Sequence, residues 1–216
     1  MGMYSTINQN VEALLASINR QSDIERYVWL LRELPNRNVE IDSEFQRAYR
    51  HYWQMNPARL SENYLASYFG YLEYLKSQHD VFDVESVARY LLTIPTHGDG
   101  RQSLQFSFAS KFVHMLNPDQ PVYDSMVEHF FFLPTAKPNE LTEQKIARLM
   151  TSYRFLQAEY GRVLEQKLLA YAIERFRAYF ELDTTYTDRK IIDTLLWKFV
   201  GFLKSGAIRS GIVVYR

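Results

Sequence analysis

The chain has 216 residues, of which 47% are hydrophobic, and its 25 Lys and Arg residues balance 25 Asp and Glu residues. This composition excludes a disordered protein, and the lack of cysteine excludes disulfides, thiol catalysis and cysteine-bound metal centres. The start of the chain lacks a signal-peptide pattern and no window approaches the roughly 18 apolar residues of a membrane span, so we expect a cytoplasmic protein that does not engage a membrane.

Apolar residues recur at helical spacing along almost the whole chain, whereas the alternation that is typical of strands is rare. The pattern predicts helices at residues 8–18, 22–33, 42–53, 61–77, 84–92, 103–116, 125–132, 141–159, 162–181 and 187–204. All seven prolines fall between these segments, where a missing backbone N–H costs little. Only residues 210–215 favour a strand. Because no linker rich in Pro, Gly or Ser divides the chain, the sequence predicts one all-α domain over residues 1–216.

The predicted helix at residues 42–53 interleaves basic and aromatic side chains. Arg47 and Arg50 alternate there with aromatic residues that include Tyr49 and Trp53. Such a mixture stacks on unpaired bases and neutralises phosphates, so Arg47 and Arg50 are candidate nucleic-acid contacts. The aromatic residues also form one stripe at helical spacing, which is typical of a surface packed into a core. Both interpretations fit the sequence.

The loop at residues 96–101 is a second candidate contact with phosphate. Its glycines, Gly98 and Gly100, let the backbone approach an anion closely, and Arg101 can bind that anion with two N–H groups. The alternative is a flexible surface loop.

The most informative segment is residues 103–127, SLQFSFASKFVHMLNPDQPVYDSMV. It predicts a helix that carries Lys111 among aromatic neighbours, then a proline turn, then a helix that Ser125 opens with a capping box to Glu128. Asp124 would lie at the N-terminus of that second helix, where free backbone N–H groups stabilise its charge. A lysine and a carboxylate in this order suit acid–base or imine-forming chemistry. They suit equally an internal brace in which Asp124 caps the helix and pairs with Lys111.

This order of helix, lysine, short turn and Pro-Val-Tyr-Asp resembles the active hairpin region of the helix-hairpin-helix DNA glycosylases, which are base-excision repair enzymes. The resemblance implies an all-α, glycosylase-like core with DNA as the partner. By position, Lys111 matches the lysine that attacks the sugar C1′ after base loss, and Asp124 matches the aspartate that stabilises the sugar cation. The glycine-rich hairpin that precedes the lysine in that family corresponds here to Gln-Phe-Ser-Phe at residues 105–108.

Two serines beside the lysine, Ser107 and Ser110, are small residues that permit close packing, and they are further candidate nucleic-acid contacts. The runs S-F-A-S-K, N-P-D and P-x-Y-D-S also resemble uncharacterised bacterial proteins. That likeness extends to FQRAYRHYW at residues 45–53 and to KIIDTLLW at residues 190–197.

Two polar side chains are expected to support the predicted site. His114 lies one helical turn after Lys111 and could carry a proton in the same cleft, although a buried structural histidine is the commoner case. Asp193 lies between apolar residues, so we expect it to be half-buried and to pair with a basic residue of another helix, for which Lys111 is one candidate.

The five histidines show no metal-ligand spacing and no nucleotide-binding motif occurs, so we expect neither a metal nor a cofactor. Residues 161–216 hold 10 basic and 6 acidic residues, which suits a DNA-binding face or an ordinary solvated surface. The leading hypothesis is a DNA-binding protein that resembles a glycosylase for a damaged or modified base. The alternative is a non-catalytic helical protein that binds another protein or a second copy of itself through aromatic helix faces and residues 212–215.

Overall fold

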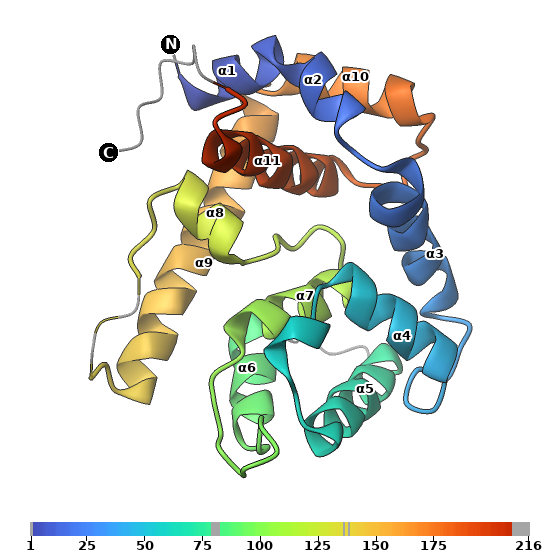
Figure 1. Ribbon diagram of the computed structural model, residues 1–216, viewed down its shortest axis with the longest axis vertical. Coiled ribbons are helices and arrows are strands. Elements are labelled where there is room, and N and C mark those ends of the chain that lie inside the picture. Colours follow the sequence, from blue (N-terminus) through green and yellow to red (C-terminus); the bar gives the residue numbers. More distant parts are fainter. Residues whose placement is uncertain (1, 79–82, 136, 138, 209–216) are drawn as a thin grey trace. The chain divides into compact units, whose positions relative to one another are not determined.

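The structure, a computed structural model, describes residues 2–78, 83–135, 137 and 139–208, and its fold is all-α with no strand in those ranges (Figure 1). The α-helices are α1 (Met3–Gln9), α2 (Val11–Ala16), α3 (Arg26–Glu33), α4 (Ser43–Tyr52), α5 (Glu62–Lys76), α6 (Val84–Leu92), α7 (Phe106–Leu116), α8 (Ser125–Phe130), α9 (Thr142–Glu165), α10 (Ala170–Phe180) and α11 (Asp188–Ser205). A π-helix, Arg20–Glu25, runs directly into α3, and a 3₁₀ turn, Asn56–Ala58, follows α4. The predicted strand at residues 210–215 lies outside the described residues.

The chain divides into two compact units. Arg20–Asn117 form one, which we call the inserted unit, and Met1–Asn19 with Pro118–Arg216 form the other, which we call the flanking unit. Lys111 therefore belongs to the inserted unit and Asp124 to the flanking unit. The prediction of a single domain over residues 1–216 stays a prediction.

The inserted unit has a core built largely from aromatic rings. Helix α6 packs against α5 and α7, and α3 packs against α4. Tyr68 and Phe112 are both fully buried, and their rings meet edge to face with centroids 5.3 Å apart. Edge-to-face contacts of this kind add to the free energy gained from burying apolar surface. The core therefore holds α7, with Lys111 on it, firmly against α5.

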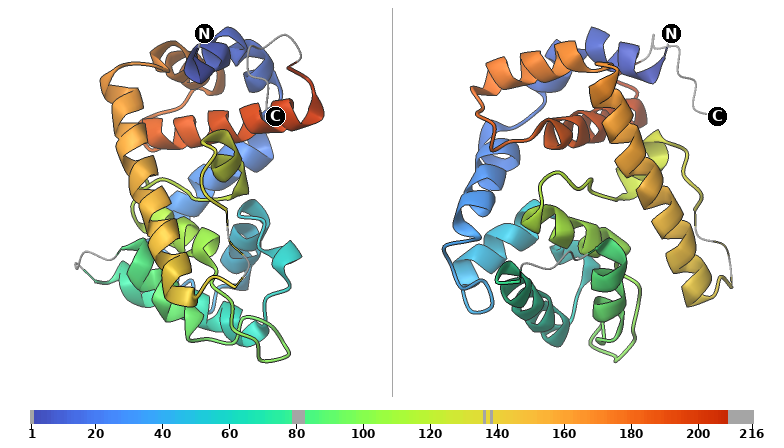
Figure 2. Two further views of the ribbon diagram at one scale, coloured as in Figure 1. Left: turned by 90° about the vertical axis from the view of Figure 1, so that its left-hand side faces the viewer. Right: turned by 180° about the vertical axis from the view of Figure 1, so that it is seen from behind.

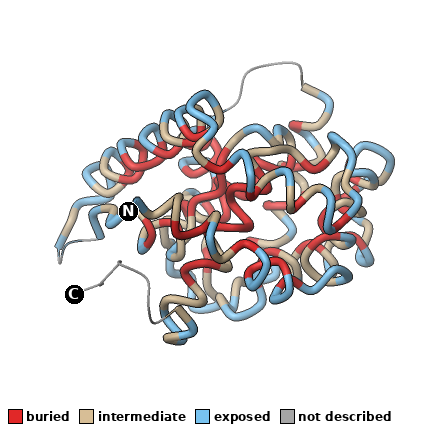
Figure 3. The backbone as a smooth tube through the Cα atoms, turned by 90° about the horizontal axis from the view of Figure 1, so that it is seen from above, coloured by how far each residue is buried: buried red, intermediate tan, exposed pale blue. Residues whose placement is uncertain are grey.

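The flanking unit is organised around α11, which contacts α1, α2, α8, α9 and α10 (Figure 2). Residues 190–196 of α11 are buried without a break, whereas its two ends are intermediate or exposed. Along much of the described backbone, by contrast, buried and exposed stretches alternate (Figure 3). The Asn8 side chain of α1 ties the unit's two sequence segments together. Its amide donates to the Leu168 carbonyl at 2.9 Å and its oxygen accepts from the Ala172 N–H at 3.2 Å.

Several predicted helix boundaries are wrong, two of them by more than a turn. The segment predicted as one helix at residues 8–18 holds only the end of α1, which begins at Met3, and then α2, with a break at Asn10. Helix α9 runs through Gly161 to Glu165, and the break before α10 comes at Lys167, which has a φ of 54°. A mid-helix glycine costs only about 1 kcal/mol relative to alanine, and the buried Tyr160 and Val163 on either side offset that cost.

Replacing Ser61 by alanine should lower the free energy of unfolding by about 1–2 kcal/mol. Ser61 is the N-cap of α5: its hydroxyl accepts from the Tyr64 N–H at 3.0 Å and donates to the Pro95 carbonyl at 2.8 Å. Urea unfolding measures the loss, and Ser61→Thr, which keeps the hydroxyl, should retain most of the stability. Equal stability of Ser61→Ala and the parent protein would contradict a capping role.

Candidate functional site

Lys111 is a lysine held almost wholly inside the inserted unit. It lies on α7, where every residue from Phe108 to Met115 is buried, and only 9% of it is exposed. Its Nζ donates to the backbone carbonyl of Trp53 at 3.2 Å and lies 5.2 Å from the centroid of the Phe108 ring. These two contacts, with a neutral oxygen and a ring face, help to orient the amine.

The Trp53 carbonyl is available to Lys111 because of how α4 ends. Trp53 is the C-cap, and the chain turns at Gln54, which has a φ of 52°. The Met55 N–H then bonds back to the Arg50 carbonyl at 2.9 Å, and the Gln54 N–H bonds to His51 at 3.3 Å. This pair of bonds is a Schellman motif, which satisfies earlier carbonyls of the last turn and leaves the C-cap carbonyl outside the helix ladder.

His114, the predicted supporting residue, is 1% exposed and lies one turn from Lys111. Its Nε2 and the Tyr27 hydroxyl are hydrogen-bonded at 2.7 Å. The His114 ring also meets the Trp53 indole nearly at right angles, with centroids 5.7 Å apart. Lys111 and His114 of α7 thus both contact Trp53, one through its carbonyl and one through its ring.

Asp124 begins the second predicted helix, in the flanking unit, but its role differs from the predicted capping box. Asp124, rather than Ser125, is the N-cap of α8: its carboxylate accepts from the N–H groups of Met126 at 2.9 Å and Val127 at 3.0 Å. Ser125 is the first helical residue, and Glu128 accepts from the Tyr123 hydroxyl at 2.6 Å instead of reaching back to the cap. The predicted Ser125–Glu128 box is therefore wrong. The carboxylate at the helix N-terminus is as expected.

Asp193, the second predicted supporting residue, pairs with a lysine that the sequence reasoning did not select. Lys190 Nζ lies 2.8 Å from the Asp193 carboxylate, three residues along the same helix. Lys190 is 4% and Asp193 8% exposed, so the expectations of a half-buried residue and of a partner on another helix, such as Lys111, are both wrong. Lys190 and Asp193 lie on the more polar side of α11, so helical periodicity gives no signal that the pair is buried.

The charge of Asp124 also affects the pKa values of ionisable groups buried in the flanking unit. Burial disfavours the charged form of Lys190, but the negative charges of Asp193 and Asp124 outweigh burial and raise the pKa of Lys190 above its usual value of 10.5. Burial, followed by the same two carboxylates, raises the pKa of Tyr160 well above its usual value. The Tyr160 hydroxyl is buried without a hydrogen-bond partner. Asp193 forms an ion pair with Lys190 at 2.8 Å, and Asp124 adds a coulombic effect.

On α4, the aromatic residues and the two predicted nucleic-acid contacts, Arg47 and Arg50, differ in burial. The aromatic stripe packs into the core, since Tyr49 is fully buried and Trp53 is 5% exposed. Arg47 is exposed and Arg50 is half-buried, with its Nε atom buried and unbonded. Both arginines thus lie at the margin of the stripe.

The other predicted contacts differ sharply in exposure. Arg101 is exposed, but its Nε lies 2.6 Å from Asp99, and its backbone N–H and then its guanidinium lower the pKa of the Asp99 carboxyl. Ser107 is half-buried, whereas Ser110 is fully buried and donates to the Ser107 carbonyl at 2.9 Å. The Ser110 hydroxyl is thus used within α7.

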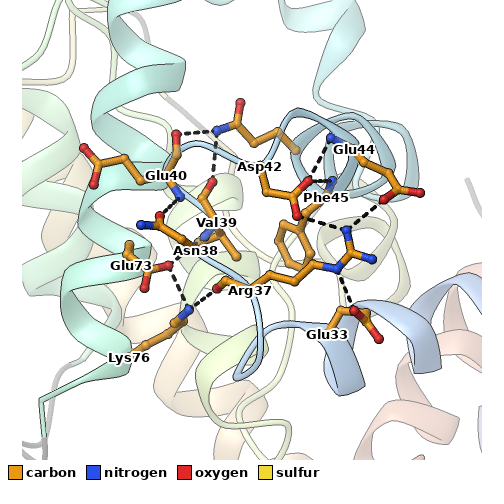
Figure 4. A network of polar contacts seen from close by, with 11 residues as sticks. Glu33, Arg37, Asn38, Val39, Glu40, Asp42, Glu44, Phe45, Glu73 and Lys76 are labelled. Atoms are coloured by element: carbon orange, nitrogen blue, oxygen red, sulfur yellow. Dashed lines mark hydrogen bonds and ion pairs between the residues drawn. The ribbon is translucent and has the colours of Figure 1, made fainter.

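A polar network that joins α3, the loop after it, α4 and α5 was not anticipated (Figure 4). Arg37 binds Glu33 at 2.6 Å, Asp42 at 2.9 Å and Glu44 at 2.7 Å. The amine of Lys76 bonds to the Arg37 carbonyl at 2.6 Å and to Glu73 at 2.8 Å. Arg37 and Lys76 each pair with carboxylates of opposite sign, so the network braces the inserted unit.

Within the described ranges, no group of three or more His, Asp or Glu side chains could hold a metal ion. No helix there is long and apolar enough to cross a membrane. Among the predicted site residues, the structure brings together Lys111 and His114 in the inserted unit, and Asp124 and Asp193 in the flanking unit. Comparison of the chain with protein-family models, with curated proteins and with solved structures gave no match.

Proposed function

We propose that the protein binds DNA and removes a damaged or modified base through an imine-forming lysine, as a base-excision glycosylase with lyase activity does. The observation that carries the proposal is Lys111, an amine that is 9% exposed, oriented by a neutral carbonyl and backed by an aromatic ring. A lysine in an apolar setting loses its proton more readily than one in water, and only the neutral amine is a nucleophile.

The proposed reaction begins with extrusion of the target base from the duplex. The bond between C1′ and the base breaks, and the base leaves with the bonding electrons and takes up a proton. The Lys111 nitrogen forms a bond to C1′ with its lone pair and loses a proton. The C1′–O4′ bond then breaks, O4′ takes up a proton, and an imine forms between Lys111 and C1′. Water hydrolyses the imine, or the C2′ carbon loses a proton and the 3′ phosphate leaves with the electrons of the C3′–O bond, which cleaves the strand.

Lys111 supplies the nucleophile from the inserted unit, whereas the Asp124 carboxylate caps α8 within the flanking unit. Arg47, Arg50 and Arg101 are the proposed phosphate contacts.

A specific observation favours the second candidate, a non-catalytic protein that binds a protein partner or a second copy of itself. Tyr171 and Tyr179 of α10 are 53% and 46% exposed, although Phe176 between them is fully buried. Exposed aromatic rings on one helix are typical of interaction surfaces. A stable dimer in light scattering, together with no affinity for DNA, would select this candidate.

Borohydride trapping on duplex DNA that carries an abasic site or an altered base tests the catalytic proposal. The protein and Lys76→Met should form a covalent adduct, whereas Lys111→Met, which nearly conserves side-chain volume, should form at least 100-fold less. Lys76 is the matched control, because it is also a partly buried lysine of the inserted unit whose amine bonds to a carbonyl.

An adduct that survives Lys111→Met, or no adduct with any substrate, would overturn the proposal. DNA affinity that falls steeply with salt should accompany trapping, because phosphate contacts release counterions.

A further inference from the structure

The position of the Lys111 amine depends on a backbone atom that belongs to a different helix. Lys111 is on α7, but the carbonyl that accepts from its Nζ at 3.2 Å is that of Trp53, the C-cap of α4. A neutral amine has two N–H bonds and one lone pair. If one N–H points at a fixed carbonyl, the lone pair has few directions left, and an attacking amine with a restricted direction reacts faster.

The Trp53 carbonyl is itself fixed from two sides. On the backbone side, the Schellman motif turns the chain at Gln54, whose φ is 52°. On the side-chain side, the Trp53 indole lies among three rings at steep angles: Tyr52 at 4.7 Å, His114 at 5.7 Å and Tyr27 at 6.3 Å between centroids.

The Tyr27 hydroxyl and His114 Nε2 close this arrangement with a hydrogen bond of 2.7 Å. Tyr27 and His114 are 0% and 1% exposed, so neither ring can rotate without displacing its neighbours. Tyr27 lies in the first turn of α3, directly after the π-helix. Three helices thus contribute to one amine position.

We propose that Trp53 is a positioning residue for the Lys111 amine: its carbonyl directs the amine, and the Tyr27–His114 pair locks its indole in place. This inference rests on the proposed function, in which Lys111 is the nucleophile. It assigns to Trp53, and through it to Tyr27 and Gln54, a contribution to the rate of imine formation and none to DNA binding.

The exposed Gln54 offers a matched pair of variants that change only the turn. Glycine adopts a positive φ freely, so Gln54→Gly should leave the carbonyl in place. Valine is strained at a positive φ, so Gln54→Val should displace the Trp53 carbonyl. Tyr27→Phe keeps the ring and removes the hydrogen bond to His114.

Single-turnover trapping at saturating DNA separates positioning from folding. Gln54→Gly should react within twofold of the parent rate. Gln54→Val should react about tenfold more slowly and Tyr27→Phe about threefold more slowly, with the same final amount of adduct and the same half-saturating DNA concentration. A reduced amount of adduct at the parent rate would show a folding role alone and overturn the proposal, as would equal rates for the two Gln54 variants.

A second measurement does not depend on activity. Reductive methylation with ¹³C-formaldehyde, read by mass spectrometry, reports the reactivity of each lysine amine, and Lys76 serves as the internal reference. The ratio of Lys111 to Lys76 labelling should change at least threefold in Gln54→Val and stay unchanged in Gln54→Gly. If the parent protein forms no adduct but this ratio changes as expected, the proposed function fails and the positioning of the amine stands. If the ratio is the same in both variants, the positioning proposal fails whatever the activity.

Discussion

Lys190→Met should lower the free energy of unfolding by about 3–5 kcal/mol, because it leaves the Asp193 carboxylate buried without its cation. The amine and the carboxylate lie 2.8 Å apart, with Lys190 4% and Asp193 8% exposed. Removing one member of such a pair costs more than the pair itself contributes, since the remaining charge is still separated from water. Urea unfolding of the purified protein measures the change.

The double variant Lys190→Met with Asp193→Leu should recover most of the lost stability, because two apolar side chains replace two charges in an apolar interior. Lys204→Met, at the exposed end of the same helix, is the matched control and should leave stability unchanged. A loss below about 1 kcal/mol in the single variant would contradict a buried, mutually dependent pair.

The pH dependence of this pair has a definite sign. The pKa of Lys190 is raised above its usual value of 10.5 in the folded protein. A raised pKa means that the stabilising contribution is complete below the unfolded-state value and is lost as the pH rises through the folded-state value. Alkaline unfolding above pH 10.5 should therefore be steeper in the parent protein than in the double variant.

Phe112→Ala should destabilise the inserted unit by about 3–5 kcal/mol, because it opens a cavity in a fully packed core. Phe112 is 0% exposed and its ring contacts Tyr68 and Tyr71, with centroids 5.3 and 5.5 Å away. Phe112→Leu keeps much of the volume and should cost only about 1–1.5 kcal/mol. Thermal or urea unfolding gives both values, and equal losses in the two variants would argue against a cavity as the cause.

The helices were predictable because their signals are local. Residues 84–92 were predicted to the residue, since apolar spacing starts after the capping Asp83 and stops before Pro95. Gly161 misled the prediction because glycine's cost in a helix is small, and burial on both sides of it decides the outcome. Sequence periodicity reports where apolar spacing starts and stops, but it does not report how deeply the residues beside a glycine are buried.

The candidate site was predictable only in part. A lysine among aromatic residues and an aspartate before a helix can be read from single positions, so Lys111 and Asp124 were selected. The Trp53 carbonyl could not be selected from the sequence, because every residue has a carbonyl. Only the turn at Gln54 leaves this carbonyl outside the hydrogen bonds of the helix. Lys190 was missed because a lysine three residues before an aspartate is usually a surface pair.

The division of the chain also sets an order of events during synthesis. The inserted unit is one continuous stretch, Arg20–Asn117, so all of its contacts are present on the nascent chain once residue 117 has left the ribosome. Helices α1 and α2 precede the inserted unit in the chain, yet they contact α10 and α11, which follow it. The apolar faces of α1 and α2 therefore stay without these partners while the inserted unit folds, and the core of the flanking unit is completed later.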